Sequence, residues 1–258
     1  MKTYVFANRK GGVGKTTLSL HFCHFLREKG AKVLLVDLDS QGNMSSTFGK
    51  TSCLASHLFS KDSPELRIEP AVQGTDPREF AIITSDSNLA ECMQFDGVGK
   101  FSRVQRLLRS ADKVWDYAII DSPPALDLFT INALVAADYL VIPSEYGDWS
   151  LRGIKEILKT VEEIRQEGLN TILKPVGIAL NKYKKSNVAD DTVAVIDEDW
   201  KNLKIEPVIP HSVKIDEANQ HVIPIWKYAP GQASAVAMKA VMTELWNRSE
   251  GQAKKEVA

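Results

Sequence analysis

Short apolar runs alternate along the chain with longer segments in which apolar residues recur every three or four positions. Most of the runs are continuous stretches of Val, Ile, Leu and Ala. Parallel strands show this pattern when helices cover both faces of their sheet. We predict strands at residues 3–7, 33–36, 81–84, 117–120, 139–142, 176–180 and 207–209.

The longer segments have the periodicity of amphipathic helices. We predict helices at residues 16–29, 101–113, 150–167 and 232–247. Strands that alternate with helices are joined by right-handed crossovers, which place helices on both faces of a twisted, mostly parallel sheet. The sequence therefore predicts one α/β domain over residues 1–248, followed by a polar, flexible tail at residues 249–258.

The composition excludes several classes of protein. With 44% hydrophobic and 25% charged residues, the chain is not wholly disordered. It lacks the roughly 18 consecutive apolar residues of a membrane-spanning helix. The three cysteines form no C-x-x-C pair, so we expect no disulfide framework and a cytoplasmic protein. A formal net charge of -1 argues against strong attraction of the whole molecule to nucleic acid, although a local basic patch is compatible with it.

A glycine-rich segment directly follows the first predicted strand and opens the first predicted helix. Its glycines allow successive backbone N–H groups to point inward around an anion, and the helix directs its positive N-terminus at the same place. The segment therefore predicts a phosphate-binding loop. The residues expected to hold the nucleotide are Gly11, Gly12, Val13, Gly14, Lys15, Thr16 and Thr17.

Lys15 and Thr16 in this loop match the positions that contact phosphate and Mg²⁺ in a P-loop NTPase. Lys15 can reach the β- and γ-phosphates, and the hydroxyl of Thr16 can ligate Mg²⁺. The usual pattern G-x-x-x-x-G-K-[ST] requires glycine at position 9, where this chain has Arg9. The segment fits a variant, K-G-G-x-G-K-[ST], in which Lys10 is an additional lysine.

Acidic residues end two of the predicted strands. Asp39 closely follows the strand at 33–36, and Asp121 follows the strand at 117–120. Because ligands bind at the carboxyl ends of parallel strands, both can converge with Lys15 on one nucleotide. We expect Asp121 to be the carboxylate on the Mg²⁺ side, directly or through water, and Asp39 to orient or activate the attacking water. Taken alone, each aspartate could simply cap the turn after its strand.

Together these motifs resemble the ParA/MinD group of ATPases. Residues 10–17 are similar to the deviant Walker A loop of that group, and residues 37–43 (D-L-D-S-Q-G-N) resemble the D-x-D-P-Q-G-N segment of its ParA branch. Residues 117–124, 137–143 and 209–218 resemble further segments of the same branch. The resemblance runs from residue 3 to about residue 245, and it is most specific in the first two motifs.

The resemblance implies a P-loop ATPase that binds ATP with Mg²⁺ and forms a homodimer with two nucleotides sandwiched at its interface. Such proteins bind double-stranded DNA without sequence specificity in the ATP state. A ParB-like or other cargo-bound adaptor stimulates their slow hydrolysis and releases them from DNA. The implied location is cytoplasmic and associated with the nucleoid, with no membrane partner. In this scheme Lys10 would reach the phosphates of the other subunit.

The resemblance also assigns residues outside the P-loop. Asn181 and Pro210 would contact the adenine, and Lys214, with Lys184 and Lys185, would contact DNA phosphates. Residues 181–185 depart from the family pattern, and each of these lysines is equally compatible with an ordinary solvated surface. The P-loop begins at residue 10, so we expect the short form of the family, without an N-terminal helix-turn-helix.

Three other functions share this fold. A MinD-like membrane-cycling ATPase needs a C-terminal amphipathic helix, and residues 247–258 lack an apolar face. A redox ATPase needs cluster-binding cysteines, whereas Ser122 follows Asp121 and no cysteine lies near that strand end. A metabolic synthetase would need a substrate pocket in place of a dimer partner, and the sequence has no signature of one.

Overall fold

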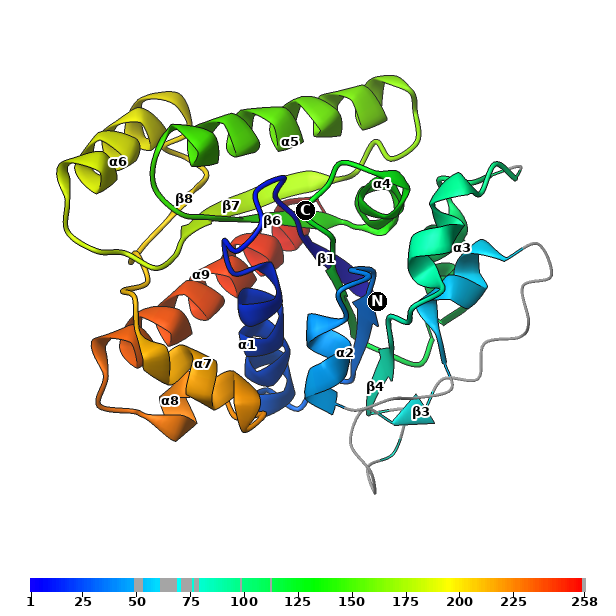
Figure 1. Cartoon of the computed structure of the whole chain (residues 1–258), viewed down its shortest axis with the longest axis horizontal. Helices are drawn as coiled ribbons and strands as arrows, with labels where there is room; N and C mark the ends of the chain where they lie inside the picture. The colour runs from blue at the N-terminus through cyan, green and yellow to red at the C-terminus, as the bar shows by residue number, and fades with distance from the viewer. Residues whose placement is uncertain are drawn as a thin grey trace.

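The computed structural model describes residues 1–48, 53–60, 69–70, 76, 79–97, 99–111 and 113–256. Its centre is a sheet with the strand order β3-β4-β2-β5-β1-β6-β7-β8 (Figure 1). All neighbouring strands pair in parallel except β3 and β4. The strands are β1 (Lys2–Phe6), β2 (Val33–Asp37), β3 (Glu69–Pro70), β4 (Phe80–Ile83), β5 (Tyr117–Asp121), β6 (Tyr139–Ser144), β7 (Lys174–Leu180) and β8 (Lys204–Ile205).

Helices cover both faces of this sheet, which confirms the predicted α/β fold with a mostly parallel sheet. In Figure 1 α1 and α9 lie together on one side of β1 and β6, and α4 and α5 lie on the other. The helices are α1 (Lys15–Glu28), α2 (Asn43–Phe48), α3 (Arg103–Ala111), α4 (Leu128–Ala136), α5 (Asp148–Gln166), α6 (Asn187–Asp199), α7 (Val213–Gln220), α8 (Ile225–Tyr228) and α9 (Ala233–Glu256). Two 3-10 helices, Ala55–Phe59 and Leu89–Gln94, lie beside them.

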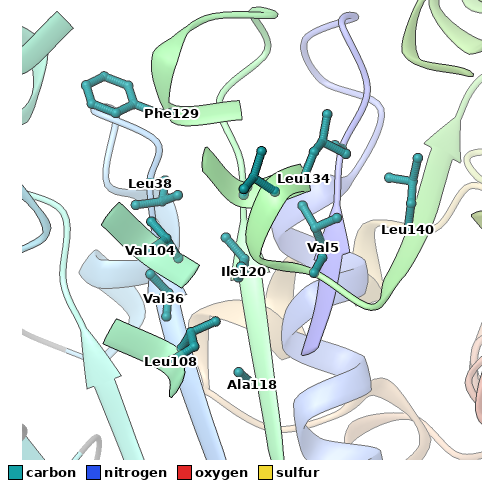
Figure 2. Close-up of a cluster of buried hydrophobic side chains, with 14 of the residues drawn as sticks. Val5, Val36, Leu38, Val104, Leu108, Ala118, Ile120, Phe129, Leu134 and Leu140 are labelled. Atoms are coloured by element: carbon teal, nitrogen blue, oxygen red, sulfur yellow. The ribbon is translucent and has the colours of Figure 1, made fainter. Parts of the chain in front are cut away.

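Successive apolar residues enter opposite cores in strands β1, β2, β4, β5, β6 and β7. Val5 belongs to the core beneath α3, α4 and α5, whereas its neighbours Tyr4 and Phe6 belong to the core beneath α1 and α9. Figure 2 shows the first core, where strand residues such as Val5 and Ile120 meet helix residues such as Leu134. Because both faces are buried, the strands are apolar at nearly every position, as the continuous runs predicted.

Five of the described helices were not predicted from periodicity, namely α2, α4, α6, α7 and α8. The α4 helix is buried on most of its surface, so it shows a nearly uniform apolar run rather than an amphipathic pattern. Its start is set by Asp127, whose carboxylate accepts hydrogen bonds from the backbone N–H groups of Phe129 and Thr130. The α6 helix starts in the same way at Ser186, which accepts from the N–H of Ala189.

Two expected boundaries need correction. The last strand lies at Lys204–Ile205 rather than at residues 207–209, because Pro207 has no N–H to donate to a strand ladder. Ile209 nevertheless donates to the carbonyl of Leu180 at 2.8 Å, so this segment lies at the end of β7.

The last helix does not end at residue 247, as periodicity predicted, and it continues into the segment from residue 249 that we expected to be a flexible tail. The α9 helix continues to Glu256, and Ser249 is fully buried, with its hydroxyl against the hydroxyl of Tyr4. The carboxylate of Glu250 pairs with the ammonium of Lys2 at 2.7 Å. The polar residues after position 248 hid these contacts, which attach the helix end to the start of the sheet.

Candidate nucleotide-binding site

The candidate site lies where the carboxyl ends of β1, β2 and β5 meet the start of α1. The parallel register places Asp121 beside Phe6 on one side and beside Asp37 on the other. The loop between β1 and α1 passes directly over these strand ends. Segments that are about 100 residues apart in the sequence are thereby brought to one edge of the sheet, as expected for a doubly wound fold.

The P-loop backbone depends on two glycines in the left-handed region. Gly12 has a φ of 78° and Gly14 a φ of 96°, a conformation that glycine adopts without steric penalty. Gly14 immediately precedes α1, and no side chain caps the first N–H groups of that helix. These donors therefore remain available to an anion at the helix N-terminus.

The loop forms one wall of a cleft of about 500 Å³. Most of the predicted nucleotide-binding residues lie along this cleft, namely Gly11, Gly12, Gly14, Lys15, Thr16 and Thr17. Val13 is instead fully buried, and its carbonyl accepts a hydrogen bond from Nδ2 of Asn181 at 3.2 Å. The sequence analysis missed other lining residues, which are Leu20, Gln41, Asn43, Thr47, Pro124, Lys182, Asp216 and Asn219.

Lys15 brings a nearly buried positive charge to the cleft. Its side chain donates to the backbone carbonyl of Lys10 at 3.4 Å, and only 7% of the residue is exposed. Burial lowers the pKa of the Lys15 ammonium, and the carboxylates of Asp121 and Asp39 oppose that shift. An anion bound in the cleft would supply further negative charge and so favour the charged ammonium.

Thr16 and Asp121 make a direct contact at the floor of the site. The hydroxyl of Thr16 donates to Oδ2 of Asp121 at 2.6 Å, and the hydroxyl of Ser19 lies 3.5 Å from the other oxygen. Asp121 is fully buried, and burial together with the nearby Asp37 raises the pKa of its carboxyl.

These oxygens fit a magnesium ion that is shared with phosphates. Mg²⁺ prefers few protein oxygens together with phosphate oxygens and water. Thr16 offers a hydroxyl oxygen beside the carboxylate of Asp121. Within the described ranges, no group of three or more His, Cys, Asp and Glu side chains could hold a metal on its own. A magnesium ion here would therefore need the nucleotide phosphates as additional ligands.

Two aspartates at the end of β2 have different environments. Asp39 lines the cleft and accepts a hydrogen bond from the N–H of Gln41 at 3.0 Å. Asp37, to which the sequence analysis gave no role, is fully buried and accepts from both the N–H and the hydroxyl of Ser45. Burial raises the pKa of Asp37 to about 6 despite these bonds. The sequence did offer a signal for Asp37, because it lies two positions before Asp39 at the end of the same strand.

Lys10 points away from the cleft of its own chain. Its ammonium donates to Oε2 of Glu145 and to the hydroxyl of Ser150, both at 3.1 Å. The structure therefore does not bring Lys10 to the phosphate site formed by Lys15 and Thr16. Its predicted action on the nucleotide of another subunit stays a prediction.

The two residues predicted to contact adenine, Asn181 and Pro210, lie in different places. Asn181 is buried behind the P-loop, where its side chain binds the loop backbone as described above. Pro210 does not line the cleft and instead pairs with Tyr183 in an isolated bridge. The adenine-binding roles of Asn181 and Pro210 stay predictions.

The predicted DNA-binding lysines lie on two neighbouring segments. The bridge between Tyr183 and Pro210 brings the loop of Lys184 and Lys185 beside the segment that leads into α7. Both of these lysines are exposed. Lys214, near the start of α7, pairs with Glu217 at 2.7 Å.

Known proteins match the chain over most of its length. A family model described as an AAA domain matches residues 1–175. The chromosome-partitioning ATPase Soj of Treponema pallidum is 33% identical over 247 residues, covering 95% of this chain and 96% of Soj. The chromosome partitioning protein ParA of Myxococcus xanthus is 31% identical, covering 94% of this chain and 87% of ParA. The chain belongs to the ParA family of P-loop ATPases.

A solved structure supports the same conclusion for the fold. Apo McdA from Cyanothece has a TM-score of 0.84, with 25% sequence identity, and the match covers 95% of this chain and 99% of McdA. Among the helices that the structure describes, none is long and apolar enough to cross a membrane.

Proposed function

We propose that this ParA-family ATPase binds ATP with Mg²⁺, forms a nucleotide-sandwich homodimer and binds double-stranded DNA without sequence specificity in that state. A cargo-bound, ParB-like adaptor would stimulate its slow hydrolysis and so release it from DNA. The protein would thereby segregate or position a plasmid, a chromosome or another cargo, and it would be found in the cytoplasm on the nucleoid. The observation that carries this proposal is a cleft lined by Lys15, Thr16 and Asp39, with the buried Asp121 hydrogen-bonded to Thr16 and with Lys10 pointing outside the cleft.

The chemistry is hydrolysis of ATP to ADP and phosphate. The N–H groups of the P-loop and the ammonium of Lys15 would hold the phosphates, because they supply positive charge at the end of α1. Bound Mg²⁺, held by Thr16 and Asp121, would neutralise phosphate charge. Asp39 would orient the attacking water and accept its proton, since its carboxylate lines the cleft.

Dimerisation would complete this site. In the free chain Lys10 is occupied by Glu145, so its charge does not reach the cleft. On a second subunit it would lie near the γ-phosphate, where negative charge develops during hydrolysis. ATP would favour the dimer because the γ-phosphate provides the contact.

Two substitutions test the ATPase. Lys15→Ala should abolish ATP binding, because it removes the buried charge from the phosphate site. Asp39→Ala should keep ATP binding but block turnover, which would accumulate an ATP-bound dimer. Binding of a fluorescent ATP analogue and release of phosphate would be measured for both. Normal turnover by Asp39→Ala would show that another group activates the water.

DNA binding is tested by titrating a random-sequence duplex with ATP, with ADP and without nucleotide, at two salt concentrations. Asp39→Ala holds the ATP state, and Lys214→Ala probes the proposed surface. Lys159→Ala is a matched control, because Lys159 also pairs with a glutamate one turn away but lies on α5. ATP-dependent binding that weakens steeply with salt would support phosphate contacts. Absence of binding by an Asp39→Ala dimer would refute the DNA part of the proposal and leave the ATPase intact.

A further inference from the structure

Lys182 has an unusual backbone conformation beside the P-loop. Its φ is 57°, in a region that residues other than glycine seldom adopt. The side chain of the preceding Asn181 supports this turn, because its Oδ1 accepts a hydrogen bond from the N–H of Lys182 at 2.9 Å. Such conformations persist where the surroundings hold them, and they gather at functional sites. The turn brings the Lys182 side chain to the nucleotide cleft.

The ammonium of Lys182 has two partners there. It donates to the backbone carbonyl of Gly12 at 2.5 Å, and it pairs with Oε1 of Glu145 at 3.0 Å. Asn181 holds the carbonyl of Val13, so adjacent side chains bind adjacent P-loop carbonyls. With these carbonyls held outward, the loop N–H groups stay free to face the phosphates.

Glu145 is shared between two lysines. Its Oε2 pairs with Lys10 at 3.1 Å while its Oε1 pairs with Lys182. The carboxylate side chain is only 24% exposed, so it depends on these partners more than a surface carboxylate would. Burial alone would raise the pKa of Glu145, but hydrogen bonds from both lysines outweigh it and lower the pKa.

This sharing matters when Lys10 moves. To reach the nucleotide of a second subunit, Lys10 must leave Glu145. A half-buried carboxylate that lost its sole cation would be left uncompensated, and that penalty would oppose dimerisation. Because Lys182 occupies the other oxygen of the same carboxylate, Glu145 would keep a cation after Lys10 departs.

We propose that Lys182 is a positioning residue that keeps Glu145 paired and thereby releases Lys10 for the nucleotide of the second subunit. This inference rests on the proposed nucleotide-sandwich dimer. In this role Lys182 contacts neither the partner subunit nor the reacting atoms. Lys182 acts on dimerisation through Glu145, so its removal should weaken the dimer only while Glu145 is charged.

The test is a double-mutant cycle between positions 182 and 145, carried out in the Asp39→Ala background. Dimer dissociation constants are measured by analytical ultracentrifugation. ATP and Mg²⁺ are kept at saturating concentrations, so that a change in nucleotide affinity does not alter the measured dimer constant. The variants are Lys182→Met, Glu145→Gln and the pair together. Lys182→Arg serves as the conservative control because it retains the charge, and melting temperatures report any loss of the fold.

We expect Lys182→Met to weaken the dimer by roughly 2- to 5-fold, the range of a partly exposed ion pair. Lys182→Arg should retain most of the parent's dimer affinity, because it keeps the positive charge. With Glu145→Gln present, Lys182→Met should have no further effect on dimerisation, because no carboxylate then competes for Lys10. The non-additivity is the signature of action through Glu145.

Two results would overturn the inference. An equal weakening of the dimer by Lys182→Met in the presence of Glu145→Gln would show that Lys182 acts through the P-loop carbonyl or elsewhere. An unchanged dimer constant for Lys182→Met would show that Glu145 does not need it. Failure of the proposed function is recognised separately, since the Asp39→Ala parent would then stay monomeric with ATP before any position-182 variant is compared.

Discussion

Thr16 and Asp121 are 105 residues apart in the sequence, yet the hydroxyl of one donates to the carboxylate of the other at 2.6 Å. The contact exists because β1 and β5 are neighbours in parallel register, so that the start of α1 lies over the end of β5. It places a fully buried carboxylate beside another buried carboxylate, Asp37. Such an arrangement is unfavourable for folding and favourable for holding a cation.

Asp121→Asn should therefore stabilise the ligand-free protein while impairing turnover. Burial and Asp37 raise the pKa of Asp121, so its ionised form destabilises the native state at neutral pH. The gain in unfolding free energy should be largest near pH 8 and should shrink as the pH falls through the raised pKa. Mg²⁺-dependent turnover should fall by roughly 10- to 100-fold, because Asn supplies no charge to the metal.

Urea denaturation across pH and a phosphate-release assay would measure these effects. Asp138→Asn is the matched control, because Asp138 accepts from the N–H of Thr3 near the other end of the sheet. That variant should not gain stability and should keep its turnover. A loss of stability in Asp121→Asn at pH 8 would contradict the account of the buried carboxylates.

The P-loop glycines should differ in their tolerance of alanine. At Gly14 an added Cβ would lie 2.2 Å from Nδ2 of Asn181, and the φ is positive. At Gly12 the φ is also positive, but no atom lies within 4 Å of the added Cβ. At Gly11 the nearest atom is Cβ of Pro124 at 3.8 Å, an ordinary contact.

We expect the loss of stability in the ligand-free protein to increase from Gly11→Ala to Gly12→Ala to Gly14→Ala. The Gly12 variant should lose about 1–2 kcal/mol from its left-handed backbone alone. The Gly14 variant should lose more, because the clash also displaces Asn181 from the carbonyl of Val13. Chemical denaturation of the three variants would measure the order, and a Gly14 variant as stable as the Gly11 variant would contradict it.

Substitution of Val222 by glycine should stabilise the protein. The φ of Val222 is 55°, and a β-branched side chain is poorly suited to that conformation. Val222→Gly should raise the free energy of unfolding by up to about 1 kcal/mol, because relief of the left-handed penalty exceeds the entropy that glycine loses on folding. The same change at Val213, which is 61% exposed in α7, should lower stability. Thermal denaturation would compare both variants with the parent.

The central fold was predictable because burial on both faces leaves a direct trace in the sequence. The runs around Val5, Leu35 and Ile120 are apolar at consecutive positions, and all of these residues are fully buried. Helix α4 could not be found in this way, since buried surroundings remove the polar face that periodicity detects. The end of α9 was missed because it is fixed by polar contacts of Ser249 and Glu250, which no local pattern announces.

The residues of the site likewise fall into those that the sequence could predict and those that it could not. Lys15, Thr16, Asp39 and Asp121 were predictable from strand ends and loop glycines, since the parallel sheet brings strand ends together. Lys182 was not predictable because its position depends on the turn after β7, where its φ is 57°. Asn219 was not predictable because it reaches the site through the contact of α7 with α1, where its side chain donates to the hydroxyl of Thr17 at 3.3 Å. The pairing of Lys10 with Glu145 was equally invisible, since it joins residues 135 positions apart.

A buried histidine and a partly buried histidine on α1 should make the protein less stable in acid. His21 is 1% exposed, and its Nε2 accepts a hydrogen bond from the N–H of Ile225 at 3.1 Å. Its Nδ1 must then carry the proton and donate to the carbonyl of Thr17 at 2.8 Å. Burial lowers the pKa of His21 to about 4, and burial together with His21 and Arg27 lowers that of His24 to about 4.

The direction of the pH effect follows from these values. An unfolded histidine titrates near pH 6.5, so between about pH 6.5 and 4 the unfolded chain binds more protons than the native protein. Stability should therefore fall as the pH falls through this window. The contribution of His21 at pH 5 should be about 2 kcal/mol relative to pH 8. Asp37 acts in the opposite direction, because its pKa is raised to about 6.

The histidine effect must accordingly be measured as a difference. His21→Gln keeps a side chain that can donate and accept but does not titrate. Its unfolding free energy, compared with that of the parent by urea denaturation at pH 8, 6 and 5, should lose less stability on acidification, by about 2 kcal/mol at pH 5. Asp37 is present in both proteins, so its contribution cancels. Parallel pH dependences for parent and variant would show that His21 is not held neutral between α1 and α8.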